Sequence, residues 1–433
     1  MTSAPIEVEA HLAEVLAAVR PLAPVRVPLA NALGRVLAAD VVADTRVPAV
    51  DNSSMDGYAV RRADVAEASA HAPADLLVVA EVAAGSPLDP TLAPGQAARI
   101  MTGAPVPSDA DAVVPVEDTA EYRSGDGWVT SGARVRVTTA PAAGAFVRRA
   151  GSDLTPGSIV LAAGARLTPY RVGAAAAAGV GAVDVFPAPR VAVIATGDEL
   201  VEPGVPTRRG QLADSNSALL RGVVSDAGGE LVAAIRVGDD PAEFLTALDE
   251  LTSPAGPPGP PGTTGATAAA AAPDVIICTG GVSVGAHDVV KAALAPGGRV
   301  AFRRVSMQPG KPQAFGRLES GALCFGLPGN PVSVAVSFEV FVRPALQAMQ
   351  GLEPAGPPRT EAIAATGWRT PPGRRQYMPI VFDGDGRIRP ATAGGSGSHL
   401  AGGLARAEGF AIVPADTDEV RAGESLPVML VAS

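Results

Sequence analysis

Residues 274–295, DVIICTGGVSVGAHDVVKAALA, decide the fold class of this chain. The stretch begins with an apolar, β-branched run typical of a buried strand, passes through a glycine-rich turn and ends in an apolar pattern with helical spacing. The same order of strand, glycine turn and helix occurs at 190–229 and at 322–349. Alternating strands and helices predict a doubly wound parallel α/β sheet, and ligands bind such sheets at the carboxyl ends of the strands.

The sequence on either side of this region has a different texture. Residues 6–20 predict an amphipathic helix, a second helix is expected from about residue 32, and short β-like runs fill 75–140 and return after 360. The chain is therefore predicted to be a multidomain α/β plus β protein. We expect a split elongated N-terminal domain (1–47 and 146–187), an inserted β domain (48–145), the α/β domain (188–355) and a C-terminal β-barrel (356–433).

One segment inside the α/β region is of low complexity. Residues 252–273 read TSPAGPPGPPGTTGATAAAAAP and lie between a predicted helix and the next predicted strand. Because Pro and Gly in such a tract bury too little apolar surface to offset the entropy of ordering, we predict a disordered surface insertion.

Composition excludes several classes of protein. The 433 residues carry 34 basic and 44 acidic side chains, a net charge of −10, which argues against a nucleic-acid or anionic-membrane surface. The N-terminus lacks the pattern of a signal peptide, and we expect a soluble cytoplasmic protein. Cys278 and Cys324 lie in apolar runs and are expected to be buried thiols. The four histidines show no catalytic or metal-ligand spacing, and we expect His11, His71 and His287 at the surface.

Three glycine loops follow predicted strands: TGDEL (196–200), TGGVSVGAHD (279–288) and LPGNPVSV (327–334). A glycine turn followed by a helix N-terminus favours anions, because the first helical amides are unpaired and the helix dipole is positive there. Each loop alone is as typical of a purely structural turn. Together with Glu199 and Asp288, three loops at one sheet edge predict a phosphate site with a bridging divalent cation, most naturally Mg²⁺.

Lysine is rare in this sequence, which uses Arg for almost every positive charge. The only two lysines are Lys291 and Lys311, and Lys311 stands in a PGKP sequence between two prolines. A compact ammonium does what a planar guanidinium cannot, so we expect Lys311 to pair with a phosphate or another oxyanion.

The motifs, taken in order, resemble the successive signatures of the molybdopterin molybdenumtransferase family, the bacterial MoeA type, which is related to the gephyrin E domain. They cover nearly the whole chain and are DNSSMDGYAV (51–60), TGAPVPSDADAVVPVED (102–118), TGDEL with QLADSNSALL (211–220), CTGGVSVGAHDVVK (278–291), PGKPQAFG (309–316) and LPGNPVSV. The resemblance implies that adenylylated molybdopterin and molybdate give the molybdenum-loaded cofactor and AMP with the help of Mg²⁺. It also implies a homodimer, with a molybdopterin adenylyltransferase as a further partner and no nucleic acid or membrane.

The same resemblance implies a set of site residues. The catalytic residues would be Asp56, Thr102, Glu199 and Lys311, and the metal would be held by Asp288 with Asp239. Substrate binding would fall to Asp214, Ser215, Asn216, Gly280, Gly281, Ser283, Gly285, Pro312, Asn330, Arg374 and Ser398. Arg374 and Ser398 match positions that contact the oxyanion.

One departure from the family pattern concerns that oxyanion. Members often have a second Lys three residues before the PGKP lysine, where this chain has Gln308. The missing cation would weaken oxyanion binding or mark a paralogue with altered metal handling. Two alternatives remain open on the same fold, a molybdopterin adenylyltransferase-like enzyme and a non-catalytic scaffold. The sequence also leaves open whether molybdate or tungstate is preferred.

Overall fold

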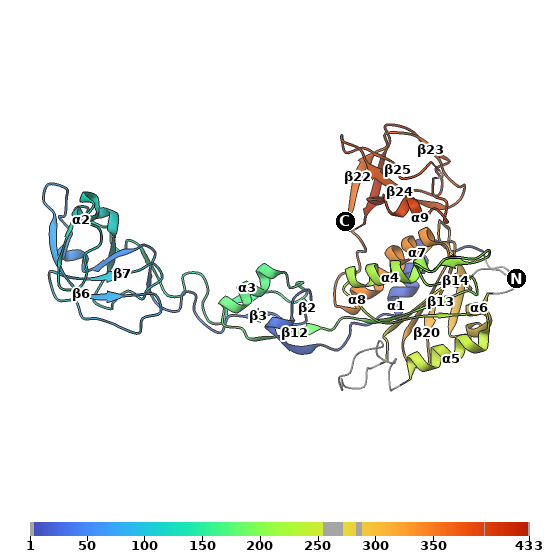
Figure 1. The fold of residues 1–433 in the computed structure, drawn as a ribbon, viewed down its shortest axis with the longest axis horizontal. Helices are drawn as coiled ribbons and strands as arrows, with labels where there is room; N and C mark the ends of the chain where they lie inside the picture. Colours follow the sequence, from blue (N-terminus) through green and yellow to red (C-terminus); the bar gives the residue numbers. More distant parts are fainter. Residues whose placement is uncertain (1–3, 254–271, 283–287, 394, 432–433) are drawn as a thin grey trace. The chain divides into compact units, whose positions relative to one another are not determined.

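The structure, a computed structural model, describes residues 4–253, 272–282, 288–393 and 395–431. The chain folds as two compact units (Figure 1). The first unit contains Met1–Val25, Gly34–Ala38 and Val185–Ser433, and the second contains Arg26–Leu33 and Ala39–Asp184. The finer division into four domains stays a prediction. Most of the predicted insertion at 252–273 lies outside the described residues.

The α/β region of the first unit is built on a six-stranded mixed sheet. Its strand order is β16 (Glu230–Val237), β13 (Arg190–Thr196), β17 (Val275–Thr279), β21 (Leu323–Leu327), β20 (Pro312–Arg317) and β18 (Val300–Arg304). The first four strands are parallel, as predicted, but β20 and β18 are antiparallel. The prediction of an all-parallel sheet is wrong at this edge, because a parallel return needs a crossover of a dozen or more residues.

Helices cover both faces of this sheet, which confirms the doubly wound arrangement. One face carries α1 (Val8–Ala18), α4 (Ser215–Asp226), α7 (Pro331–Ser337), the π-helical turn η4 (Phe338–Val342) and α8 (Arg343–Met349); the other carries α5 (Pro241–Thr252) and α6 (Val289–Leu294). Successive strand residues point to opposite faces, so Val193 belongs to the core that contains Val224 and Phe338, while Ile194 belongs to the core that contains Phe244. The predicted helix at 6–20 is confirmed as α1.

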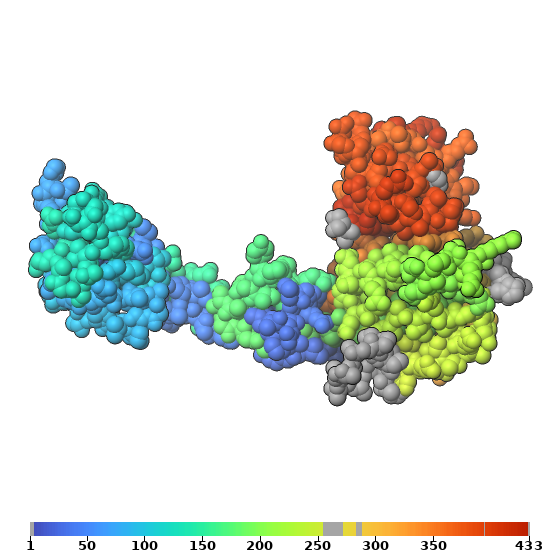
Figure 2. Space-filling model, in the orientation of Figure 1, coloured from blue at the N-terminus to red at the C-terminus, as the bar shows by residue number. Residues whose placement is uncertain are grey.

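The C-terminal part of the first unit is a second β layer. Its sheet runs β19 (Met307–Gln308), β24 (Arg375–Phe382), β26 (Gly409–Val413), β28 (Ser425–Leu430) and β22 (Arg359–Ile363), with β25 (Ile388–Pro390) on β24. A β-bridge between Ala364 and Ile388 connects the end of β22 to β25. Because β25 also pairs with β24, the last strand of the sheet is linked back to β24. Figure 2 shows these C-terminal residues, orange to red, lying directly against the α/β region.

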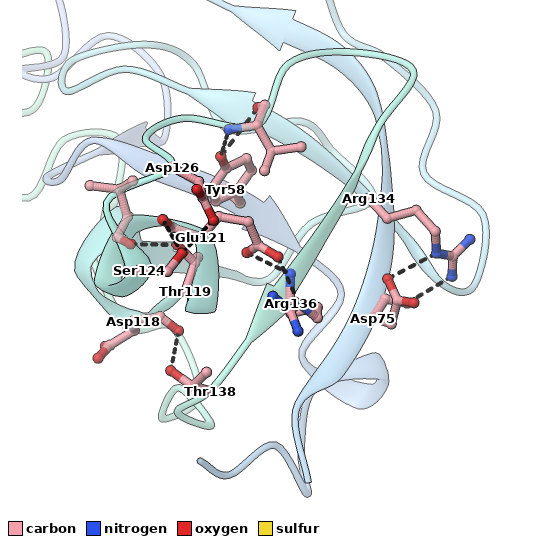
Figure 3. A network of polar contacts seen from close by, with 12 residues as sticks. Tyr58, Asp75, Asp118, Thr119, Glu121, Ser124, Asp126, Arg134, Arg136 and Thr138 are labelled. Atoms are coloured by element: carbon pink, nitrogen blue, oxygen red, sulfur yellow. Dashed lines mark hydrogen bonds and ion pairs between the residues drawn. The ribbon is translucent and has the colours of Figure 1, made fainter. Parts of the chain in front are cut away.

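The second unit contains a five-stranded sheet. Its order is β8 (Ala112–Pro115), β5 (Gly57–Val60), β7 (Gln96–Ile100), β6 (Ala74–Val82) and β9 (Arg134–Val137). Figure 3 shows the polar contacts around its outer strand, where Arg136 Nε donates to Glu121 of α2 (Ala120–Ser124) at 2.9 Å and Arg134 Nε donates to Asp75 at 2.8 Å. These contacts fasten the edge strand β9 to α2 on one side and to β6 on the other.

The predicted second helix from about residue 32 is wrong. The segment forms η1 (Leu29–Asn31), β2 (Val36–Leu37) and β3 (Val41–Val42). Gly34 lies at φ +77°, a conformation that ends a helix, and the valines then pair with β12 (Ala182–Phe186) and β11 (Ile159–Leu161).

The remaining elements are α3 (Pro169–Ala177), α9 (Ala401–Leu404), η2 (Arg62–Asp64), η3 (Val116–Asp118), β1 (Val25–Pro28), β4 (Asn52–Ser53), β10 (Val147–Arg148), β14 (Leu200–Val201), β15 (Leu212–Ala213), β23 (Trp368–Arg369) and β27 (Glu419–Val420).

One helical run, Pro331–Met349, is long and apolar enough to cross a bilayer. Its most apolar window is 83% buried within the protein, and its side chains form the centre of the larger core. The run is therefore a core helix. Cys278 and Cys324 are both buried and free, as the sequence predicts.

His11 is buried, with 1% of its surface exposed, and this corrects the expectation that it lies at the surface. Its ring packs edge-on against Phe341 at a centroid distance of 4.7 Å. Burial lowers the pKa of His11 to about 4 from the ordinary value of 6.5. His71 is exposed as expected, and His287 lies outside the described residues.

This burial predicts an acid-sensitive fold. A histidine whose pKa is depressed by folding stabilises the protein fully above pH 6.5, and that contribution is lost as the pH falls toward 4. We expect the free energy of unfolding to fall by up to about 3 kcal/mol from this group across that window. Urea unfolding at a series of pH values should show a shallower acid dependence for His11→Leu than for wild type. Equal slopes would contradict the assignment.

Candidate functional site

A cavity of about 560 Å³ lies at the carboxyl ends of β13, β17 and β21. The three glycine loops meet there, as the sequence predicts. The lining residues are Thr196, Gly197, Glu199, Leu200, Leu212, Ala213, Asp214, Ser215, Asn216, Asp239, Thr279, Gly280, Gly281, Asp288, Gly329, Asn330, Pro331 and His399.

The glycines at the base of this cavity have no room for a side chain. Gly280 lies at φ +88°, and a Cβ there would stand 2.9 Å from the carbonyl oxygen of Thr196. Gly281 lies at φ +60°, where a Cβ would stand 3.0 Å from the amide nitrogen of Val290. The double glycine therefore lets the loop pack closely against both β13 and α6, and it leaves backbone at the cavity surface.

The start of α4 is held by its own polar side chains. Asp214, which is 3% exposed, accepts a hydrogen bond from the Ser217 amide at 3.0 Å and caps the helix. Asn216 Nδ2 donates to the Gly329 carbonyl at 2.7 Å and so joins α4 to the third glycine loop. Asp214 and Asn216 therefore build the wall of the cavity, while Ser215 lies between them on it.

Three polar oxygens in the cavity wall are buried and have no hydrogen-bond partner among the residues that the structure describes: Asn216 Oδ1, Thr279 Oγ1 and Asp288 Oδ2. A buried polar group without a partner is costly, so these atoms are suited to receive hydrogen bonds or a cation from a ligand. Asp288 starts α6 but makes no capping bond with its side chain. The Asp288 carboxylate is therefore not used to cap α6.

The carboxylates in this cavity fit a metal only in part. Glu199, Asp239 and Asp288 all line it, but within the described ranges no three His, Cys, Asp or Glu side chains lie close enough together to bind a metal. Mg²⁺ is commonly held by one or two carboxylates together with substrate phosphates and water. Asp288 and Asp239 therefore suit a cation that arrives with a phosphorylated ligand.

Arg304, Lys311 and Arg374 form a group of positive charges beside the C-terminal sheet. Partial burial and the neighbouring charges of Arg374 and Arg304 lower the pKa of Lys311 from its ordinary value. In the part of the chain that the structure describes, no carboxylate forms an ion pair with any of the three.

The residues next to this group behave differently. Arg303 pairs with Glu14 at 3.4 Å, and Arg375 pairs with Glu9. Both carboxylates come from α1. They neutralise Arg303 but not the adjacent Arg304, and Arg375 but not the adjacent Arg374. Arg304 and Arg374 keep their charge available, which is what an oxyanion site needs.

The PGKP turn is fixed from beneath. Gly310 lies at φ +101°, and a Cβ there would stand 2.9 Å from Ser337 Oγ. The buried Gln313 donates both to the Gly310 carbonyl and to Ser337 Oγ, each at 2.7 Å. Lys311 therefore stands on a turn whose backbone has little freedom, with Pro312 opening β20 behind it.

Asn330 is the N-cap residue of α7, which begins at Pro331, but its side chain makes no capping hydrogen bond. Its Nδ2 donates instead to Ser398 Oγ at 2.9 Å, and the Ser398 carbonyl accepts from the Val332 amide at 3.2 Å. The 395–399 loop thus links the cavity, through Asn330 and His399, to the C-terminal sheet. Lys311, Pro312, Arg374 and Ser398 do not themselves line the cavity, and Ser283 and Gly285 lie outside the described residues.

Asp56 and Thr102 belong to the second unit, where they bind each other. Asp56 Oδ1 accepts from the amide and from the hydroxyl of Thr102, both at 2.7 Å. These two hydrogen bonds, the amide first, lower the pKa of Asp56. The structure therefore brings together this predicted pair and, separately, the cavity residues of the first unit.

Sequence reasoning missed Thr196 as a site residue. Thr196 Oγ1 donates to the Thr279 carbonyl at 3.1 Å, joining the ends of two neighbouring strands under the cavity. Both loops begin with Thr-Gly directly after a strand, and this repetition is the signal that could have identified the pair. His399 was also missed and gave no comparable signal.

A second cavity, of about 520 Å³, lies between α4, η4 and the C-terminal sheet. Its walls are mainly apolar, and its one cation, Arg343, is already paired with Glu339 and with Asp226 at 2.8 Å. It offers no unpaired charge to a phosphate, so the polar cavity is the better candidate site.

Comparison with known proteins gives the family. Three sequence profiles match in succession: "MoeA N-terminal region (domain I and II)" at 6–179, "Probable molybdopterin binding domain" at 192–348 and "MoeA C-terminal region (domain IV)" at 361–431. The second profile contains all three glycine loops and both predicted metal ligands.

Whole-length relatives agree with the profiles. Molybdopterin molybdenumtransferase 2 of Mycobacterium tuberculosis is 42% identical over 428 residues, which are 97% of this chain and 98% of that protein. Molybdopterin molybdenumtransferase of Haemophilus influenzae is 34% identical over 403 residues, 92% of each chain. The crystal structure of a molybdopterin biosynthesis MoeA protein from Pyrococcus horikoshii matches with a TM-score of 0.77 at 28% identity and covers 99% of both chains. The chain therefore belongs to the MoeA family, the molybdopterin molybdenumtransferases of molybdenum cofactor biosynthesis.

Proposed function

We propose that this protein inserts molybdate into adenylylated molybdopterin and releases AMP. The observation that carries the proposal is the polar cavity at the carboxyl ends of the parallel strands, where glycine-loop backbone and four carboxylates converge. Three buried oxygens in its wall have no hydrogen-bond partner among the described residues. A ligand with phosphate groups and a polar ring system suits such a wall, and the relatives' names give the chemistry to which it belongs.

The residues of the cavity would divide the work by their chemistry. The start of α4, with Asp214, Ser215 and Asn216, and the Gly280–Gly281 turn would seat the pterin and its phosphates, because glycine lets a phosphate approach the backbone. Asn330 would add an amide at the third loop. The Glu199 carboxylate lies directly over Gly197, where only a hydrogen leaves room for it, and is the candidate group for moving a proton.

Asp288 and Asp239 would hold Mg²⁺ together with the substrate's phosphate oxygens. The unpartnered Oδ2 of Asp288 is the observation that fits this role. When bound, the ion would neutralise negative charge that develops as the pyrophosphate linkage breaks.

Molybdate would bind at the group of cations. It is a tetrahedral dianion, and Lys311, Arg374 and the Ser398 hydroxyl are suitable donors. The 395–399 loop would bring this anion to the pterin, because the same loop contacts Asn330 and contributes His399 to the cavity wall.

The proposed enzyme is a homodimer in which Asp56 and Thr102 of one copy complete the site of the other. The second unit exposes apolar side chains that suit such an interface. Ile159 is 61% exposed and stands opposite Val42, which is 41% exposed, and Tyr170 is 89% exposed. Burying such residues against a second copy would favour association.

We therefore expect Ile159→Asp combined with Tyr170→Asp to shift the protein from dimer to monomer, because a charged side chain is costly to bury in an interface. Turnover should fall at least about tenfold, since each active site would lose the residues that the second copy contributes. Sedimentation velocity measures the oligomeric state. Leu88→Asp is a matched control, because Leu88 is 57% exposed in the same unit but lies on a loop away from these strands. A dimer that persists in the double variant would remove this face from the interface.

The proposed location is the cytoplasm, where reduced thiols such as the buried Cys278 and Cys324 persist. There the substrate would come from a molybdopterin adenylyltransferase, the expected partner.

The test of the function is AMP release from adenylylated molybdopterin by the purified full chain. We expect release to require both molybdate and Mg²⁺ and to yield a cofactor that reconstitutes a molybdenum apoenzyme. Molybdopterin with ATP is the control substrate for an adenylyltransferase. Turnover of that pair, or the absence of any turnover with either substrate, would overturn the proposal in favour of the adenylyltransferase or the scaffold.

A further inference from the structure

Gln308 is in contact with the proposed oxyanion site. Arg374 Nη1 donates to the Gln308 side-chain oxygen at 3.2 Å. The backbone fixes both partners, because β19 pairs in parallel with β24 and the Arg375 amide donates to the Ser306 carbonyl at 3.0 Å. The contact therefore follows from the junction between the α/β region and the C-terminal sheet.

The carboxamide suits this place for an electrostatic reason. Partial burial, followed by the neighbouring positive charges of Arg374 and Arg304, lowers the pKa of Lys311. A carboxylate in place of Gln308 would hold Arg374 but cancel its charge, and a lysine has no acceptor at all. A neutral amide oxygen orients the guanidinium and leaves its charge available.

We propose that Gln308 is a positioning residue for oxyanion binding, whose carboxamide oxygen holds the Arg374 guanidinium beside Lys311 while Arg304 supplies a third positive charge. This inference rests on the proposed function of the site.

A residue that acts through another leaves a thermodynamic signature. Without Gln308 the Arg374 side chain must be ordered when the anion binds, and this entropy loss weakens binding. Without Arg374, Gln308 has nothing to hold. The effects of replacing the two residues must therefore be coupled.

The experiment is a double-mutant cycle on the full chain with Gln308→Ala, Arg374→Ala and the combined variant. Inorganic molybdate is titrated calorimetrically, and the molybdate concentration for half-maximal AMP release is measured in parallel. We expect Gln308→Ala to weaken molybdate binding about three- to tenfold in the wild-type background and less than about twofold in the Arg374→Ala background. In Gln308→Ala the loss should appear in the molybdate concentration for half-maximal release and not in the half-saturating concentration of the pterin substrate.

Gln347→Ala is the matched control. Gln347 on α8 also bonds through its amide, to the Gly356 carbonyl at 3.2 Å and the Gly356 amide at 2.9 Å, away from the cations. It should leave molybdate binding unchanged. An equal loss in both Arg374 backgrounds, no loss in either, or a wild-type chain that does not bind molybdate overturns the inference. Wild-type binding of molybdate without AMP release would instead overturn the proposed function, since calorimetry does not need turnover.

Discussion

Replacing Asp288 by Asn should reduce Mg²⁺-dependent AMP release on the order of 10²–10³-fold, because the variant loses a preorganised charge at the proposed metal site. The Asp288 Oδ2 atom is buried and has no hydrogen-bond partner in the described ranges, and an amide supplies neither the charge nor the affinity of a metal ligand. The fold should survive, since the side chain makes no capping bond and Asn is equally acceptable at the start of a helix.

Turnover across a Mg²⁺ titration, together with thermal unfolding, checks this expectation. Asp249→Asn is the matched control, because Asp249 is an exposed carboxylate on α5 outside the cavity. It should match wild type in both assays. Near-normal turnover of the Asp288 variant across the whole Mg²⁺ titration would remove Asp288 from the proposed metal site.

Replacing Lys311 by Ala should raise the molybdate concentration for half-maximal turnover about tenfold or more, and Arg should not restore it. Lys311 stands on a turn that Gln313 and Ser337 fix from beneath, and Gly310 leaves no room for the backbone to adjust. Arg304 and Arg374 already lie close enough to lower the pKa of Lys311. A guanidinium at position 311 is wider than an ammonium and would crowd Arg304 and Arg374. Its charge is also spread over a plane, so it would attract a single oxyanion oxygen less strongly than the compact ammonium does.

The measurement is AMP release across a molybdate titration for wild type, Lys311→Ala and Lys311→Arg. Lys291→Arg is the control for the exchange itself, because Lys291 is the only other lysine and lies on α6. We expect Lys291→Arg to match wild type and the half-saturating pterin substrate to change little in every variant. If Lys311→Arg follows the wild-type curve, Lys311 is only a positive charge and its rarity carries no meaning.

The convergence of the glycine loops could be predicted from sequence alone. Each of the three loops follows an apolar strand and precedes a helix, and parallel strands place such loops at one edge of the sheet. Glu199 and Asp288 therefore line the same cavity because each lies in a loop that follows a parallel strand, and the local sequence pattern already predicts those strands and loops. The buried cysteines were predictable on the same ground, since β17 and β21 are apolar throughout.

Local patterns failed where the neighbours of a segment decide its structure. The run after residue 32 is apolar enough for a helix, but strands β11 and β12, more than a hundred residues later, pair with its valines. His11 has no sequence feature that distinguishes it from an exposed histidine. It is buried because Phe315 and Phe341, from β20 and η4, pack around α1.

The sequence by itself thus determined the alternation of strands and helices, the loops at the strand ends and the kinds of side chain available there. Only the tertiary structure decided which charges remain available. Arg375 is neutralised by Glu9, 366 residues away, whereas Arg374 is oriented by Gln308, 66 residues away. The neighbouring arginines receive opposite roles because Arg375 begins β24 and faces α1, whereas Arg374 lies just before the strand and faces Gln308. These partners meet only when α1 and the C-terminal sheet pack against the α/β region.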